Sequence, residues 1–171
     1  MSIRAVVAVA CAVATVLQAC GIRGLNFVQD ERVEIIAPEP RAEVTLPVTI
    51  RWKVEHFEVT GPTRRATADA GYFGVFVDRA PPGPGQTLES LAEDDPVCEA
   101  TPGCPDEGYL AGHWAYTTNE TSFTVERVPE LTVDRTREAH EVTVVLLDGR
   151  GRRMGESAFR AEFQVRRQVR R

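Results

Sequence analysis

Three stretches of this chain alternate apolar and polar residues with a period of two, and this pattern constrains the fold more than any other feature of the sequence. The apolar positions of the first stretch, residues 48–55, are Val48, Ile50, Trp52 and Val54. Successive side chains of a β-strand point to opposite faces, so this stretch predicts a half-buried strand with Trp52 in the core. The other two stretches, residues 139–147 and 158–165, predict strands near the end of the chain.

The stretch at residues 139–147 becomes apolar on both faces toward its end. His140, Val142, Val144 and Leu146 share one face, and Val145 and Leu147 share the other. A strand that is apolar on both faces is covered on both sides, so we expect it to be central in its sheet.

β-branched and aromatic residues between turn-forming residues predict four further strands. Their ranges are residues 32–37, 71–78, 109–117 and 122–127. Thr87 is a suitable cap for a short helix over residues 88–92. About seven short strands with almost no helix predict an all-β fold, a two-sheet antiparallel sandwich.

Residues 79–108 interrupt this pattern and predict a long insert that leaves the sheet. Every residue from 81 to 85 is Pro or Gly, and such a run does not continue a strand. We expect residues 93–108 to form a loop closed by Cys98 and Cys104. Loops of this length in compact domains are usually functional or disordered, and a cross-link favours order.

The strand pattern resembles immunoglobulin-like or fibronectin-III-like domains of exported bacterial proteins. The stretches that carry the resemblance are residues 36–44, 47–52, 140–148 and 159–165. The resemblance implies an immunoglobulin-like sandwich that acts as a spacer or a binding module, and it implies no chemistry.

The first 20 residues have the parts of an export signal. A single arginine precedes an apolar run over residues 5–17, which is shorter than the about 20 residues that a membrane-spanning helix needs. The segment Leu17-Gln18-Ala19-Cys20 resembles the lipobox of bacterial lipoproteins. This resemblance implies cleavage before Cys20 and attachment of lipid to its thiol, with an uncleaved anchor as the alternative.

These features divide the chain into four parts. We predict a signal peptide at residues 1–19, a lipidated N-terminus and short tether at 20–31, the immunoglobulin-like sandwich at 32–166, and a basic tail at 167–171. The predicted location is outside the cytoplasm, on the cell membrane or the outer membrane, with the lipid anchor as the link to the membrane.

Export favours oxidation of the two cysteines in the insert, Cys98 and Cys104, because exported proteins meet an oxidising compartment. Cys98 and Cys104 are therefore predicted to form a disulfide, which stabilises a small ring by about 2 kcal/mol. The alternative is a metal site that includes His113, but the spacing matches no zinc pattern.

The formal net charge of −5 argues against general nucleic-acid binding. Acidic residues gather in the insert, and arginines gather in the last quarter of the chain. The basic segment has two interpretations, a solvated turn and tail or a contact with anionic envelope polymers or lipid headgroups.

The insert and the aromatic residues after it are the candidate binding region, residues 86–116. The acidic candidates are Glu93, Asp94 and Asp95, and the aromatic candidates are Tyr109, His113 and Trp114. Carboxylates beside aromatic rings suit recognition of a peptide, a sugar or a cationic surface. Two alternatives are a calcium site and a plain solvated loop in which Trp114 is a core residue.

No sequence motif of a known catalytic site occurs in the chain, and the three histidines are scattered. We therefore predict no catalytic residues, no metal ligands and no cofactor. The leading hypothesis is a non-catalytic, lipid-anchored module that binds an envelope protein or polymer. The alternatives are a spacer without a ligand and, more distantly, a metal-binding module or an extracytoplasmic hydrolase.

Overall fold

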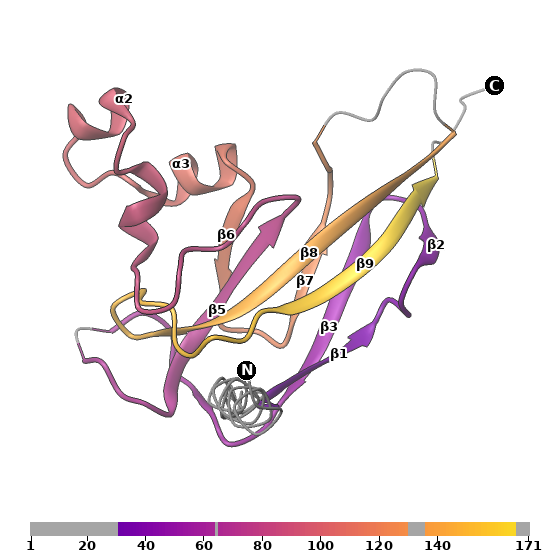
Figure 1. The fold of residues 1–171 in the computed structure, drawn as a ribbon, viewed down its shortest axis with the longest axis horizontal. Coiled ribbons are helices and arrows are strands. Elements are labelled where there is room, and N and C mark those ends of the chain that lie inside the picture. The colour runs from indigo at the N-terminus through magenta and orange to yellow at the C-terminus, as the bar shows by residue number, and fades with distance from the viewer. Residues whose placement is uncertain (1–30, 64, 130–135, 167–171) are drawn as a thin grey trace, which may run out of the picture.

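The computed structural model describes residues 31–63, 65–129 and 136–166 (Figure 1). Cys20, the export signal, most of the predicted tether and the basic tail lie outside the described residues. Among the residues that are described, no helix has the length and apolar character needed to cross a membrane.

Two β-sheets make up the framework of the molecule (Figure 1). The small sheet has the order β1-β3-β7, with bounds Val33–Ala37, Val48–Val54 and Ser122–Val125. The large sheet has the order β2-β9-β8-β5-β4, with bounds Ala42–Val44, Phe159–Arg166, Arg137–Asp148, Ala70–Val77 and Glu58–Val59. Strand β6, Ala115–Thr118, also pairs with β5. The chain is therefore mostly β and consistent with a β-sandwich, as the alternation predicted.

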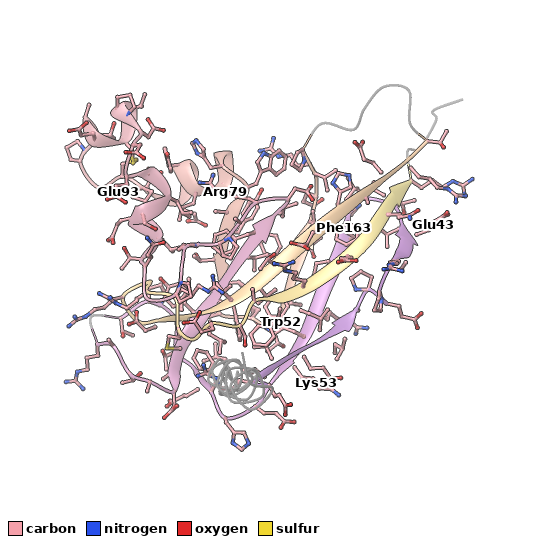
Figure 2. All side chains as sticks on the ribbon, in the orientation of Figure 1. Glu43, Trp52, Lys53, Arg79, Glu93 and Phe163 are labelled. Carbon is pink, nitrogen blue, oxygen red and sulfur yellow. A yellow bond between two sulfur atoms is a disulfide. The ribbon has the colours of Figure 1, made fainter. Side chains whose placement is uncertain are left out.

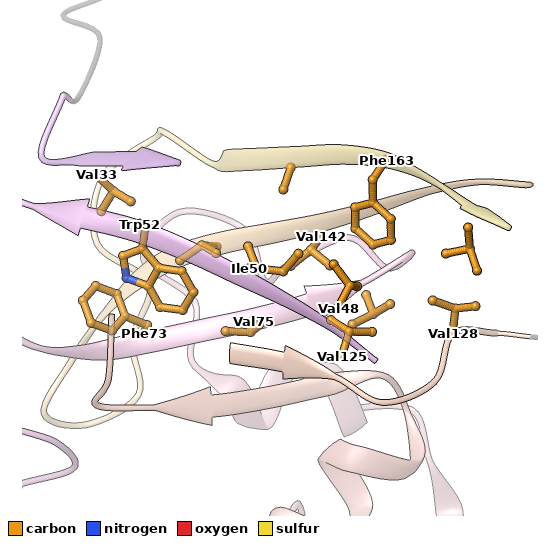
Figure 3. Close-up of a cluster of buried hydrophobic side chains, with 14 of the residues drawn as sticks. Val33, Val48, Ile50, Trp52, Phe73, Val75, Val125, Val128, Val142 and Phe163 are labelled. Atoms are coloured by element: carbon orange, nitrogen blue, oxygen red, sulfur yellow. The ribbon is translucent and has the colours of Figure 1, made fainter. Parts of the chain in front are cut away.

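The main core lies between the two sheets (Figure 3). Trp52 on β3 is 2% exposed, and its ring meets the edge of Phe73 on β5 at 5.2 Å between centroids. The prediction that Trp52 is a core residue is confirmed. Alternation of side chains along β3, β5, β8 and β9 supplies most of this core, because each strand turns one face toward the opposite sheet.

Strand β8 is buried on both faces, as its sequence predicted. Val142, Val144 and Leu146 belong to the main core, whereas Val145 and Leu147 belong to a second apolar cluster. β8 lies between β9 and β5 in the large sheet. Since the second cluster lies on the face of the large sheet that points away from β3, something else must cover that face.

Two features of the sheets differ from the sequence predictions. The large sheet is mixed, because β2 runs parallel to β9 and β4 runs parallel to β5. The described residues form nine strands, and the short strands β2 and β4 were not expected. Both are two or three residues long, so neither has enough alternation to be recognised in the sequence.

Candidate functional site

The insert forms a helical cap over the outer face of the large sheet. It contains a 3₁₀-helix, η1 (Leu88–Ala92), and two short α-helices, α2 (Pro96–Glu99) and α3 (Glu107–Gly112) (Figure 1). Leu88, Leu91 and Leu110 pack against the second apolar cluster, which includes Phe76 and Val145. Burial of these side chains explains why both faces of β5 and β8 are apolar.

The helix expected over residues 88–92 is present. Thr87 precedes it, but the Thr87 hydroxyl bonds the carboxylate of Glu89 and does not cap the helix backbone. The prediction of a loop over residues 93–108 is wrong in part, because α2 and the start of α3 lie within this range. The strand expected over residues 109–117 is also wrong in its first half, because α3 continues to Gly112 and β6 begins only at Ala115.

Two aspartates explain why short helices form in this segment. Asp95 Oδ1 accepts hydrogen bonds from the backbone N–H groups of Val97 at 2.8 Å and Cys98 at 3.4 Å. Asp106 Oδ1 accepts one from Tyr109 N at 2.8 Å. These are N-cap contacts, which satisfy backbone donors that a helix leaves free at its start. Asp95 and Asp106 therefore have a structural role that the acidic composition alone did not reveal.

The predicted disulfide between Cys98 and Cys104 is present. It joins α2 to the segment just before α3. The Cys98 side chain is buried, so the cross-link fixes the position of α2 relative to the rest of the insert.

Asp95, Tyr109 and His113 lie together. The Tyr109 hydroxyl donates to Asp95 Oδ2 at 2.8 Å, and the rings of Tyr109 and His113 stack at 4.1 Å between centroids. The hydrogen bond from Tyr109, followed by that from Val97 N–H, lowers the pKa of Asp95. Desolvation, followed by the bond to Asp95, raises the pKa of Tyr109. Three of the six predicted binding residues thus form one connected group.

The other three predicted residues do not join this group. Glu93 and Asp94 are exposed, and Glu93 lines a shallow hollow of about 530 Å³ with Thr87, Glu89 and others. Trp114 is partly buried against the main core, with the guanidinium of Arg127 5.4 Å from its ring centroid. The position of Trp114 agrees with the alternative in which it is a core residue.

Asp78 and Arg79 attach the insert to the sandwich, and sequence reasoning missed both. Asp78 follows β5 with a positive φ of 49°, and its Oδ1 accepts a bond from Glu141 N at 2.8 Å. Arg79 Nη1 donates to the backbone oxygen of His113 at 2.9 Å, and Nη2 donates to that of Leu91 at 3.3 Å. Arg79 thereby joins the beginning of the insert to η1 and to the end of α3. Figure 2 marks Arg79 beside α3 and Glu93 farther out on the cap.

His140 on β8 also belongs to this attachment. Its Nδ1 lies 2.6 Å from Asp78 Oδ2, and its side chain is 5% exposed. His140 Nε2 is buried and has no hydrogen-bond partner in the described residues. An Asp–His pair resembles part of a catalytic triad, but a general base needs its free nitrogen within reach of the reacting group. The pair joins β8 to the residue that follows β5, and both of its residues line a hollow of about 330 Å³.

The described part of the chain holds no group of three or more His, Cys, Asp or Glu side chains that could share a metal ion. Asp95 and Asp106 direct oxygen atoms to backbone N–H groups. The calcium alternative therefore has no set of converging ligands among these residues.

The arginines of the last quarter of the chain have different environments. Arg153 is 8% exposed and donates to the backbone oxygens of Pro82 at 2.7 Å and Glu156 at 2.8 Å. Burial lowers the pKa of Arg153. Arg160 lies 3.6 Å from Glu141. Arg153 thus secures the proline-rich start of the insert and is not a contact for an anionic polymer.

Comparison of the chain with protein-family models, with curated proteins and with solved structures found no match.

Proposed function

We propose that this protein is a lipid-anchored, extracytoplasmic module that binds an envelope protein or polymer through residues 86–116 and performs no catalysis. The lipobox-like segment at Cys20 supports the anchor and the location. The ordered insert supports the binding role, because the disulfide, the two capping aspartates and Arg79 hold its outer residues in defined positions, as preorganised binding residues require.

Strand order supports the finer proposal of an immunoglobulin-like sandwich. In such folds strands A, B and E lie in one sheet and strands C, F and G lie in the other. Here β1, β3 and β7 correspond in order to A, B and E, and β5, β8 and β9 correspond to C, F and G. Helices over the outer face of the second sheet are then an addition to the common framework.

The observation that carries the binding proposal is the connected group of Asp95, Tyr109 and His113. A stacked pair of rings with a bonded carboxylate presents an apolar face beside polar atoms, and its geometry is fixed before a ligand arrives. Preorganised groups bind with a smaller loss of conformational entropy. Aromatic residues at such positions are common in binding sites.

A sedimentation assay tests the proposal. The Cys20→Ser chain, which lacks the predicted lipid, is mixed with envelope membranes from cells that lack the protein. We expect it to sediment with the membranes, and we expect Tyr109→Ala combined with His113→Ala to weaken this association about tenfold, the effect of losing about 1.4 kcal/mol. The matched control is Thr49→Ala combined with Thr124→Ala, which breaks a 3.0 Å hydrogen bond on the small sheet.

Equal sedimentation of all three proteins would assign the binding to another surface. No sedimentation of any of them would favour the alternative of a spacer that needs only its anchor and its fold.

A further inference from the structure

The tip of the cap exposes apolar side chains. Val97 on α2 is 71% exposed, and Ile36 at 40% is the other exposed large hydrophobic residue among those described. Pro96, Ala100 and Pro102, which surround Val97 in the chain, are exposed as well. Apolar side chains that gather at one exposed place mark interaction sites more often than those scattered singly. We call residues 96–102 the α2 tip.

The α2 tip is held in one conformation. The Cys98–Cys104 disulfide closes the segment, and Asp95 caps the helix from its first turn. The Thr101 hydroxyl donates to the backbone oxygen of Val97 at 2.7 Å. Exposure of an apolar side chain to water is unfavourable, so the exposed Val97 side chain would gain free energy when a partner covers it. A side chain held in this way loses little conformational entropy on binding.

Exposed carboxylates lie within the α2 tip and on both sides of it in the sequence. Glu93, Asp94, Glu99 and Glu107 are all exposed. Residues 80–126 contain no lysine or arginine, so the segment itself is acidic, and Arg152 is the basic residue that lines the hollow beside Glu93. A partner surface with lysines or arginines around an apolar centre is the complement of this arrangement.

The position of the α2 tip favours a protein over the membrane that holds the anchor. Figure 1 places α2 at an outer corner of the molecule, far from the start of β1, where the tether joins the sandwich. Anionic lipid and anionic polymers would also be repelled by the carboxylates around Val97.

We propose that the α2 tip is the docking point for a protein that inserts the Val97 side chain into an apolar pocket lined by lysine and arginine. This inference rests on the proposed binding function and specifies which part of residues 86–116 makes the contact and what kind of partner it takes. The group of Asp95, Tyr109 and His113 then contributes to binding by holding α2, because Tyr109 donates to Asp95, the N-cap residue of that helix.

Site-specific photo-crosslinking in the producing cells tests this inference. The photo-reactive residue p-benzoylphenylalanine replaces Val97 in the full chain, or replaces Ile36 as the matched exposed control, or replaces His113. We expect a discrete protein adduct from position 97 and none from position 36. We expect the yield to fall about tenfold when Glu93→Gln, Asp94→Asn and Glu99→Gln are added, because charges at the rim of an interface control association.

The outcomes separate the two proposals. An adduct from position 97 that needs the carboxylates and joins a basic surface of the partner, located by peptide mapping, supports the inference. A polysaccharide adduct, or an adduct that persists after neutralisation, overturns it. Crosslinking from position 113 alone also overturns it but leaves the proposed binding function intact. No adduct from position 97 or 113 contradicts both proposals.

Discussion

At the scale of single residues, Asp95 has more contacts than its place in a run of three acidic residues suggests. Its carboxylate accepts bonds from two backbone N–H groups of α2 and from the Tyr109 hydroxyl. Glu93 and Asp94 are exposed. Asp95 therefore bonds groups within the cap, whereas the side chains of its two acidic neighbours face solvent.

The pKa of Asp95 leads to the first prediction. Because the folded pKa lies below the ordinary value of 3.8, the ionised carboxylate stabilises the fold above that pH, and this contribution is lost as the pH falls through the lowered pKa. Asp95→Asn should remove this acid dependence. The melting temperatures of the original chain and of Asp95→Asn, measured from neutral pH to below pH 3.8, check this prediction. The same dependence of melting temperature on pH in both proteins would contradict it.

The pKa of Tyr109 leads to a second prediction in the opposite direction. Its folded pKa lies above the ordinary value of 10.0, so protonated Tyr109 stabilises the fold below that pH and the contribution is lost as the pH rises through the raised pKa. In Asp95→Asn the charge that opposes ionisation is gone, and Tyr109 should ionise at lower pH than in the original chain. Ultraviolet absorbance of tyrosinate reports this, with Tyr109→Phe identifying the signal.

Asp78 and His140 lead to a third prediction. Asp78→Ala leaves the buried His140 without its 2.6 Å partner and should lower the free energy of unfolding by about 1–3 kcal/mol. Replacing both residues, Asp78→Ala with His140→Phe, removes the polar pair together and should cost less than the sum of the single changes. Denaturant unfolding of the four proteins in this cycle measures the difference. Additive losses would mean that the pair has no mutual dependence.

At the scale of elements, the sequence predicted strands better than it predicted the insert, and the reason is physical. β3 and β9 alternate apolar and polar residues over seven and eight residues, and β5 and the end of β8 are apolar runs; both patterns are local signals. The helix α3 was missed, since Tyr109 and the aromatic residues that follow the helix favour a strand. It forms because Asp106 caps it and Leu110 packs on a sheet that is distant in sequence. The disulfide was predicted from the cysteine count, whereas the Arg79 clamp depends on tertiary contacts that no local pattern contains.

The second apolar cluster supplies the prediction at this scale. Leu110 on α3 is 7% exposed and packs over the outer face of β5 and β8, so Leu110→Ala should destabilise the cap by about 2–5 kcal/mol. Hydrogen exchange should quicken in α2 and α3 but not in β3, which belongs to the main core. The control Val97→Ala, at an exposed position, should change stability by less than about 0.5 kcal/mol. Uniform quickening across both sheets would mean that cap and sandwich unfold as one unit.

At the scale of the whole molecule, the protein has two layers of strands and a cap on one side. The cap covers part of the outer face of the large sheet. Another part of that sheet carries ion pairs, which join Arg137 to Glu43, and Arg160 to Glu141. Such exposed pairs add little stability but keep the surface hydrated. The uncovered part is therefore an ordinary solvated surface, and the α2 tip is the feature that distinguishes this molecule from a plain sandwich.

The proposed lipid anchor at Cys20 would determine how far the sandwich lies from the membrane. Between Cys20 and the start of β1 at Val33 the chain can span at most roughly 45 Å, so a lipid on Cys20 would keep the sandwich close to the membrane. Cys20→Ser should abolish labelling by radioactive fatty acid and should release the protein from membranes that are washed with high salt, which weakens the proposed charged contact with a partner. Its melting temperature should not change, because Cys20 precedes the strands of both sheets in the sequence. Cys11→Ser is the matched control and should leave location and labelling unaltered. A Cys20→Ser protein that stays with the membrane and takes up as much lipid would show that the attachment lies elsewhere.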